Sequence, residues 1–274
     1  MIPLLLLMGC KADPADDATC GAESDTVVAV ITELTFGRRA EDGTAWGFDL
    51  DGFDSDPGDS EGCGAGDFTD PEGHAGIDSA FSGLVPALEA TEASAVEDLI
   101  QDSIRNGQLL LMLELSRVDD PVDDDCVDVG VWRGEGTPLT GTDGGVLDSQ
   151  TFLRSDLPPA LMPGAALVDG TTWAQPLDMN LPMQVLDVEL NFSITDGAIR
   201  VDLHEDGSIS GYLGGAVPVS DILGIVAEDD LADIRDLVTG LVELAADMHP
   251  DEDGVCQSLS IVLEFEGTRA FFYE

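Results

Sequence analysis

Basic residues are scarce in this chain. Lysine occurs once, at Lys11, and 10 lysines and arginines stand against 56 aspartates and glutamates, which gives a formal net charge of −46. Such a surface repels phosphate groups, so nucleic acid is a poor partner, and anionic membrane surfaces are equally unfavourable. Three explanations of the acidity remain open: adaptation to a salty habitat, binding of divalent cations, or solubility alone.

The signatures of common enzyme classes are also missing. His74, His204 and His249 show no H-E-x-x-H spacing, and no two cysteines form a C-x-x-C pair, so zinc is not indicated. The chain has neither a G-x-S-x-G elbow nor a P-loop lysine. The sequence therefore favours a non-enzymatic protein. A hydrolase that uses paired carboxylates stays an alternative, because 56 acidic residues give no means of selecting two.

A short apolar run opens the chain and ends at a cysteine. The run from Ile2 to Met8 is far shorter than the roughly 20 residues of a membrane-spanning helix. The motif Leu7-Met8-Gly9-Cys10 resembles the lipobox of bacterial lipoproteins. This resemblance implies a signal peptide over residues 1–9 and a lipid on Cys10, which would attach the protein to the membrane. Because Lys11 and not aspartate follows the cysteine, it also implies the outer membrane or cell surface. Residues 10–25 then read as an acidic tether.

Four cysteines remain once Cys10 is assigned to the lipid: Cys20, Cys63, Cys126 and Cys256. An even number in an exported protein predicts two disulfide bonds. Four cysteines allow three pairings, and the sequence does not choose among them.

Residues 26–274 are predicted to form a single β-rich domain with helical segments near 77–106 and 219–248. Groups of strands joined by hairpins and separated by helices predict an α+β fold, mainly antiparallel β, in which a β-sandwich-like sheet carries three to four packed helices. The first predicted strand, 26–36, has a hairpin partner at 45–50.

The clearest pattern is a three-stranded meander over 184–217, with turns at Asp196-Gly197 and Asp206-Gly207. The last strand begins at Cys256, and residues 269–273 read as one more. Residues 134–182, rich in glycine, proline and threonine, give only short strand-like pieces around 165–168 and 171–174.

Two acidic loops are the candidate metal sites, and Ca²⁺ is the candidate cofactor. Alternating carboxylates offer hard oxygen ligands, and a neighbouring glycine lets backbone carbonyls join them. Both loops resemble fragments of calcium loops of the D-x-D-x-D-G type. The candidate ligands are Asp49, Asp51, Asp54, Asp56, Asp59, Asp251 and Asp253. The segment Asp49–Asp78 also resembles stretches in uncharacterised secreted lipoproteins of Gram-negative predatory bacteria, which implies export but no activity.

The polar face of the predicted meander is a candidate binding face. Its residues are Arg200, Asp202, His204, Ser208, Ser210 and Tyr212. A glycan or a protein could bind there. Two apolar helices against a curved sheet could instead enclose a lipid chain. The sequence thus predicts a non-enzymatic, lipid-anchored cell-envelope protein stabilised by calcium, with lipid or glycan binding as the alternative.

Overall fold

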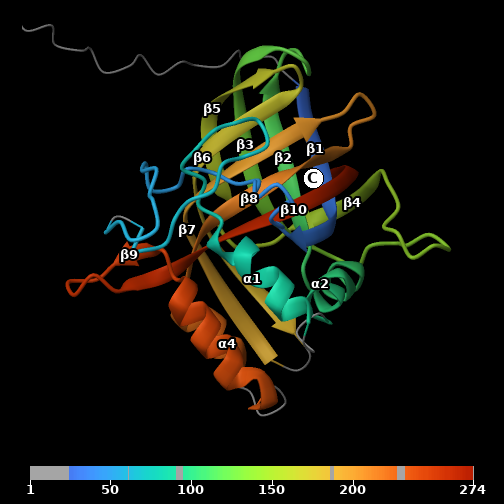
Figure 1. The fold of residues 1–274 in the computed structure, drawn as a ribbon. Helices are drawn as coiled ribbons and strands as arrows, with labels where there is room; N and C mark the ends of the chain where they lie inside the picture. Colours follow the sequence, from blue (N-terminus) through green and yellow to red (C-terminus); the bar gives the residue numbers. More distant parts are fainter. Residues whose placement is uncertain (1–24, 61, 91–94, 186–187, 227–231, 274) are drawn as a thin grey trace, which may run out of the picture.

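The computed structural model describes residues 25–60, 62–90, 95–185, 188–226 and 232–273 (Figure 1). Its strands are β1 (Asp25–Phe36), β2 (Leu111–Val118), β3 (Asp124–Glu135), β4 (Gln150–Arg154), β5 (Ala160–Val168), β6 (Thr171–Val185), β7 (Val188–Leu203), β8 (Ile209–Pro218), β9 (Met248–Pro250) and β10 (Cys256–Phe272). Its helices are α1 (Ala80–Glu89), α2 (Ala95–Arg105), α3 (Val219–Val226) and α4 (Ala232–Ala245). Cys10, Cys20 and most of the predicted tether lie outside the described residues.

Eight of the strands close into an antiparallel barrel. Each of β1, β2, β3, β5, β6, β7, β8 and β10 pairs with the next, and β10 returns to pair with β1. The predicted β-sandwich-like sheet is therefore wrong. Alternating apolar residues specify one buried face, but they do not specify whether the two edges of a sheet meet. The closing pairs join residues at opposite ends of the chain, for example Ala29 and Arg269.

The inward faces of the strands form the core. Buried side chains from all eight barrel strands belong to one cluster, with Ile31, Leu113, Ile199 and Phe265 among the largest fully buried residues. Side chains from all eight strands thus pack against one another in the barrel interior, which is one of the arrangements that an eight-stranded barrel allows.

The helices gather at one end of the barrel instead of covering a sheet face (Figure 1). Phe81 of α1, Ile104 of α2 and Val242 of α4 join the barrel core cluster. The rings of Phe36 and Phe81 lie 4.8 Å apart and link the end of β1 to α1. The prediction that helices pack on a sheet is corrected accordingly: their apolar stripes close the end of the barrel. None of the helices in the described ranges is long and apolar enough to cross a membrane.

Several strand boundaries differ from the predictions. Residues 45–50 form only isolated bridges, so the predicted hairpin partner of β1 is absent from the described structure. Asp196-Gly197 is not a turn: β7 runs through it, with a register shift and a φ of 50° at Asp196. A left-handed aspartate followed by glycine suits a bulge as well as a turn. The turn at Asp206-Gly207 is confirmed, because β7 pairs with β8 across it.

Two longer strands were also underestimated. The short pieces predicted near 165–174 belong to β5 and to the 15-residue β6, which pairs with β7 along most of its length. The pattern of β6 is interrupted by Pro176 and by register shifts, which hide its period. The two last strands predicted are one strand, β10.

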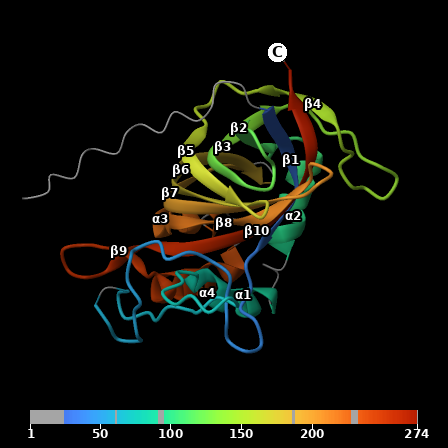
Figure 2. The same ribbon diagram turned by 90° about the horizontal axis from the view of Figure 1, so that it is seen from above.

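The segment between β1 and α1, described over residues 37–60 and 62–79, lies outside the barrel beside β9 and β10, where Figure 2 shows it in blue and teal. We call it the loop layer. A Cβ atom on Gly214 of β8 would stand 2.7 Å from the Phe48 ring, so this glycine permits the close approach of the layer. A disulfide bond between Cys63 and Cys256 fastens the layer to β10. Cys126 is disulfide-bonded as well.

Candidate functional site

The loop layer brings two neighbouring carboxylates, Asp49 and Asp51, together with Asp78, which lies 27 residues after Asp51 in the chain. Ligand oxygens of Asp49, Asp51 and Asp78 all lie within 4.8 Å of one another. Asp78 precedes α1 and is only 2% exposed. One of its oxygens accepts the backbone N–H of Leu50 at 2.6 Å and that of Asp51 at 3.3 Å. We call these three residues the carboxylate trio.

Electrostatics in this region favour the neutral form of buried carboxyls. Burial raises the pKa of Asp78 to about 8, the hydrogen bond from Leu50 opposes the shift, and the negative charges of Asp51, Asp247 and Asp67 add to it. The pKa of Asp247, which is 4% exposed, is raised to about 6, chiefly by burial. Burial and neighbouring aspartates also raise the pKa of Asp67. Without a cation, the trio therefore keeps a proton on Asp78 at neutral pH.

Asp78 was not among the predicted ligands. Asp49 and Asp51 were, and the structure joins them to it. A signal for Asp78 exists in the sequence: it is a single acid between Ile77 and the apolar start of α1, a position that predicts burial.

The other predicted metal ligands have different roles. Asp54 lies near enough to Asp67 to raise its pKa. The carboxylate of Asp59 accepts the backbone N–H of Asp56 at 3.0 Å, which stabilises a local turn. Among the described residues, these side chains do not belong to a cluster of three metal-ligating groups.

The second acidic loop is a hairpin tip between β9 and β10. The carboxylate of Asp251 accepts the backbone N–H groups of Asp253 and Val255, both at 2.9 Å. The side-chain amide of Gln257 donates to it at 3.1 Å. These hydrogen bonds stabilise the turn, and this structural role explains why an aspartate stands at position 251.

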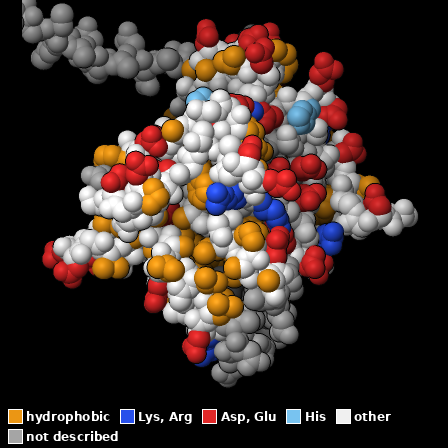
Figure 3. Space-filling model, viewed as in Figure 1, with side chains coloured by type: hydrophobic (Ala, Val, Ile, Leu, Met, Phe, Trp, Pro, Cys, Tyr) orange, Lys and Arg blue, Asp and Glu red, His pale blue; other side chains and the backbone are white. Residues whose placement is uncertain are grey.

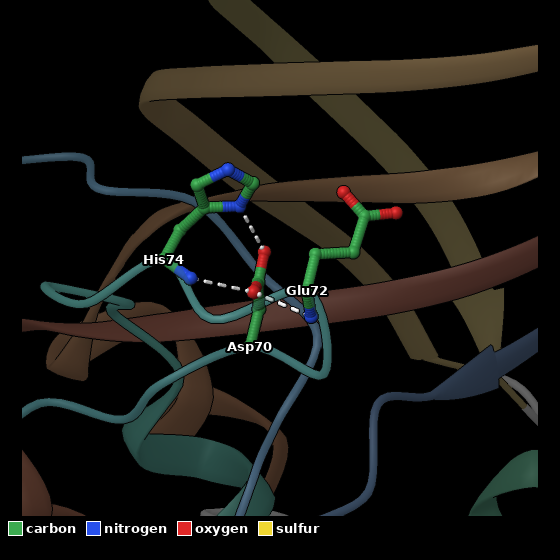
Figure 4. Close-up of side chains that lie close together, drawn as sticks. All are labelled: Asp70, Glu72 and His74. Atoms are coloured by element: carbon green, nitrogen blue, oxygen red, sulfur yellow. Dashed lines mark hydrogen bonds and ion pairs between the residues drawn. The ribbon is translucent and has the colours of Figure 1, made fainter.

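A second group of possible ligands lies in a tight turn of the loop layer (Figure 4). The Asp70 carboxylate accepts the backbone N–H groups of Glu72 and His74, and it lies 2.8 Å from Nδ1 of His74. This contact raises the pKa of His74. Burial acts on Asp70 in the opposite sense, but the bonds from His74 and Glu72 lower its pKa. Both carboxylate oxygens of Asp70 thus take part in holding the turn.

A serine, a histidine and an aspartate also lie in a row. His249 contacts Ser258 through Nδ1 at 3.0 Å and Asp196 through Nε2 at 2.8 Å. The hydroxyl belongs to a residue that is 3% exposed. A nucleophilic hydroxyl must reach its substrate, and this one is buried, so the row does not form a hydrolase site. Its contacts instead link β9, β10 and β7.

The predicted binding face lies on the outer surface of β7 and β8. Arg200, Asp202 and Tyr212 point outward, and His204 contacts Ser210 Oγ at 3.0 Å. The carboxylate of Asp202 accepts N–H groups of Arg200 at 3.3 Å and the Thr171 hydroxyl at 2.7 Å.

Aromatic rings that the sequence did not place on this face surround Arg200. The ring of Trp46, from the loop layer, stacks on Tyr212 with centroids 5.2 Å apart. The guanidinium carbon of Arg200 lies 5.3 Å from the ring centroid of Trp46 and 5.3 Å from that of Trp173. We call Trp46, Trp173, Arg200 and Tyr212 the aromatic face. The sequence marks residues 171–174 only as a short strand-like piece and does not pair it with a neighbouring strand, so Trp173 was not placed on this face.

No protein-family model, no curated protein and no solved structure matches this chain. Function therefore has to be inferred from its own side chains. Carboxylates are spread widely over the view in Figure 3, and hydrophobic side chains gather there over α1 and α4.

A further hollow lies beside β4. It is an open depression of about 670 Å³ lined by residues that include Glu135, Leu139, Phe152 and Tyr273. Leu139 and Tyr273 are 67% and 69% exposed, so the depression is shallow and open to solvent.

Proposed function

We propose that this chain is an exported, non-enzymatic protein of the cell envelope, attached to the outer membrane or cell surface by a lipid on Cys10 and stabilised by Ca²⁺ at the carboxylate trio. The observation that carries the calcium proposal is the approach of three carboxylates within 4.8 Å, one of them buried. Ionised carboxylates at this distance repel one another strongly in a low-dielectric surrounding. A divalent cation would remove that repulsion.

The donor set suits calcium better than the other common metals. The trio consists of aspartates alone, and Ca²⁺ prefers oxygen ligands in a flexible cage of six to eight. Zinc prefers nitrogen and sulfur ligands, and Mg²⁺ keeps several of its waters. Three carboxylates supply up to six oxygens, with backbone carbonyls and water completing the shell.

A melting series tests the calcium site. The full mature chain is melted in EDTA, in Ca²⁺ and in Mg²⁺ at constant ionic strength, because the net charge of −46 makes stability depend on salt in general. Micromolar Ca²⁺ is expected to raise Tm through preferential binding to the folded state. Asp51→Asn should abolish this rise, and Asp251→Asn, in the second acidic loop, should leave it intact. A rise that follows ionic strength alone would contradict the proposal.

Lipid attachment has a separate test. The full-length chain, expressed in a Gram-negative host with radiolabelled palmitate, should acquire label and partition with the outer-membrane fraction. Cys10→Ser should lose both properties, and Cys63→Ser should keep the label. Label on the Cys10→Ser variant would refute the assignment. This result is independent of whether Ca²⁺ binds.

The alternatives fit the structure less well. Asp78, whose pKa of about 8 would suit a general acid, is 2% exposed and bonded to the backbone. Lipid carriage needs an interior chamber, whereas side chains from all eight strands meet inside the barrel. Glycan binding, in contrast, has a definite surface available to it.

A further inference from the structure

The aromatic face is built from residues that stand directly opposite one another on neighbouring strands. Trp173 of β6 pairs with Arg200 of β7, which in turn pairs with Tyr212 of β8. Side chains in such a row lie on the same side of the sheet and approach one another closely. The row therefore crosses three strands on the outer wall of the barrel, and Trp46 covers its centre from the loop layer.

A second row, made of polar side chains, runs beside the first. Thr171, Asp202 and Ser210 pair across the same three strands, two residues further along each. They supply hydroxyl and carboxylate oxygens next to the rings. A ligand lying along the strand-to-strand direction would meet aromatic surface on one side and hydrogen-bonding groups on the other, which is the usual composition of a binding site for a polar organic molecule.

Internal packing explains only part of the aromatic face. Trp46 and Phe48 fasten the loop layer to the barrel, because the Trp46 ring stacks on Tyr212 and the Phe48 ring meets the Trp173 ring edge-on at 5.5 Å. Trp173 nevertheless remains 45% exposed, while Phe48 is 5% exposed. The exposed part of the Trp173 ring is therefore available for stacking with a ligand.

The charges around the face restrict its ligand. Arg200 is paired with Asp202 at 3.3 Å and with Glu72 at 3.4 Å, so its positive charge is already compensated. Glu264 lies opposite Tyr212 on β10 and raises the pKa of that residue further, after burial, to about 12. The surroundings are thus net negative, which disfavours anionic glycans and nucleic acid. A neutral ligand pays no such electrostatic cost.

We propose that a neutral oligosaccharide binds along the polar row of Thr171, Asp202 and Ser210, beside Trp46, and lies across β6, β7 and β8. The apolar face of one pyranose ring would stack on the exposed ring of Trp173, and its hydroxyls would bond to Asp202. From Thr171 to Ser210 the polar row spans two interstrand spacings of about 4.8 Å, or about 10 Å in all, which matches the length of two linked pyranose rings. The proposal does not depend on calcium at the carboxylate trio.

Tryptophan fluorescence and calorimetry on the full mature chain test the proposal. The probes are cellohexaose, chitohexaose, laminarihexaose and maltohexaose, each at millimolar concentration, with polygalacturonate as the anionic comparison. At least one neutral probe is expected to bind with a dissociation constant below the millimolar range. Polygalacturonate is expected not to bind. Binding of none of the four neutral probes would overturn the proposal.

The three tryptophans allow a matched set of variants. Trp173→Ala should weaken binding roughly tenfold or more, because one stacked ring is lost. Trp132→Phe is the control: its ring lies 4.2 Å from the guanidinium carbon of Arg154 and packs against Phe272, away from the aromatic face. That variant should bind as the wild type does.

A milder variant guards against misfolding. Asp202→Asn keeps nearly the same side-chain shape, and its amide oxygen can still accept the Thr171 hydroxyl, so it should fold normally. It is expected to bind the same probe several-fold more weakly than the wild type does. Equal affinity of the wild type and a folded Trp173→Ala variant would refute the site even if an oligosaccharide binds elsewhere.

Discussion

Replacing Asp78 with asparagine separates the buried proton from the rest of the carboxylate trio. Asparagine has nearly the same shape, and its carbonyl oxygen can still accept the N–H of Leu50, which donates to Asp78 at 2.6 Å. The amide does not titrate. The substitution therefore removes one proton equilibrium, and with it the charge that Asp78 gains above about pH 8, while it leaves the packing of the loop layer in place.

The magnitude follows from the pKa of Asp78, which is about 8 in the folded protein against an ordinary value of 3.8. Between these values the folded state holds a proton that the unfolded state has released. Stability from this group is thus complete below about pH 4 and is lost as the pH rises towards 8. The slope is about 1.4 kcal/mol per pH unit, so up to about 4 kcal/mol disappears between about pH 5 and pH 8.

The assay is urea unfolding of the wild type and Asp78→Asn at several pH values in EDTA. The difference between their free energies of unfolding should shift in favour of the variant by up to about 4 kcal/mol across this range. Comparing the two proteins cancels the general repulsion among other carboxylates. A difference that stays constant with pH would show that Asp78 does not hold the proton, and the reasoning would fail.

Calcium binding offers a second measurement of the proton on Asp78. Binding Ca²⁺ at the trio must displace the proton on Asp78, so affinity should rise with pH up to about 8 and level off above it. Proton release into a weakly buffered solution measures this directly. Asp51→Asn serves as the matched control, because it removes one ligand but retains the buried Asp78. Calcium should bind this variant more weakly, while most of the pH dependence of its calcium affinity remains.

Two other features of the loop layer lead to predictions. Gly214→Ala would place a methyl group 2.7 Å from the Phe48 ring and should destabilise the fold by about 1–3 kcal/mol in urea unfolding, whereas Gly240→Ala, with open space around it, should stabilise α4 by up to about 1 kcal/mol. Equal effects of the two would argue against the close approach. The disulfide bond joins Cys63 and Cys256, which are 193 residues apart in the chain. Replacing both with serine should lower the free energy of unfolding by about 2–5 kcal/mol. An unchanged unfolding midpoint would contradict that expectation.

Local patterns in the sequence were sufficient for many individual elements. The β-branched run of β1, the apolar stripe of α2 and the turn at Asp206-Gly207 are recovered because each depends on residues only a few positions apart. Where one sequence pattern is compatible with two local structures, the prediction made from it was wrong. An Asp-Gly pair serves a turn at Asp206 and a bulge at Asp196, and the choice depends on how far the neighbouring strand continues.

The candidate sites show the same division. The sequence by itself determined the acidity of the loop layer, the alternation that points Arg200, Asp202 and Tyr212 to one side, and the supply of cysteines for a disulfide bond. Each of these is a matter of composition or of a two-residue period.

Tertiary structure decided the rest. Closure of the barrel pairs β1 with β10, and pairing within it sets Trp173 opposite Arg200. Folding of the loop layer against the barrel then buries Asp78 beside Asp51. All three are contacts between segments that are far apart in the chain, so no local periodicity in the sequence predicts them. They depend on register and burial, which arise only when every strand is in place.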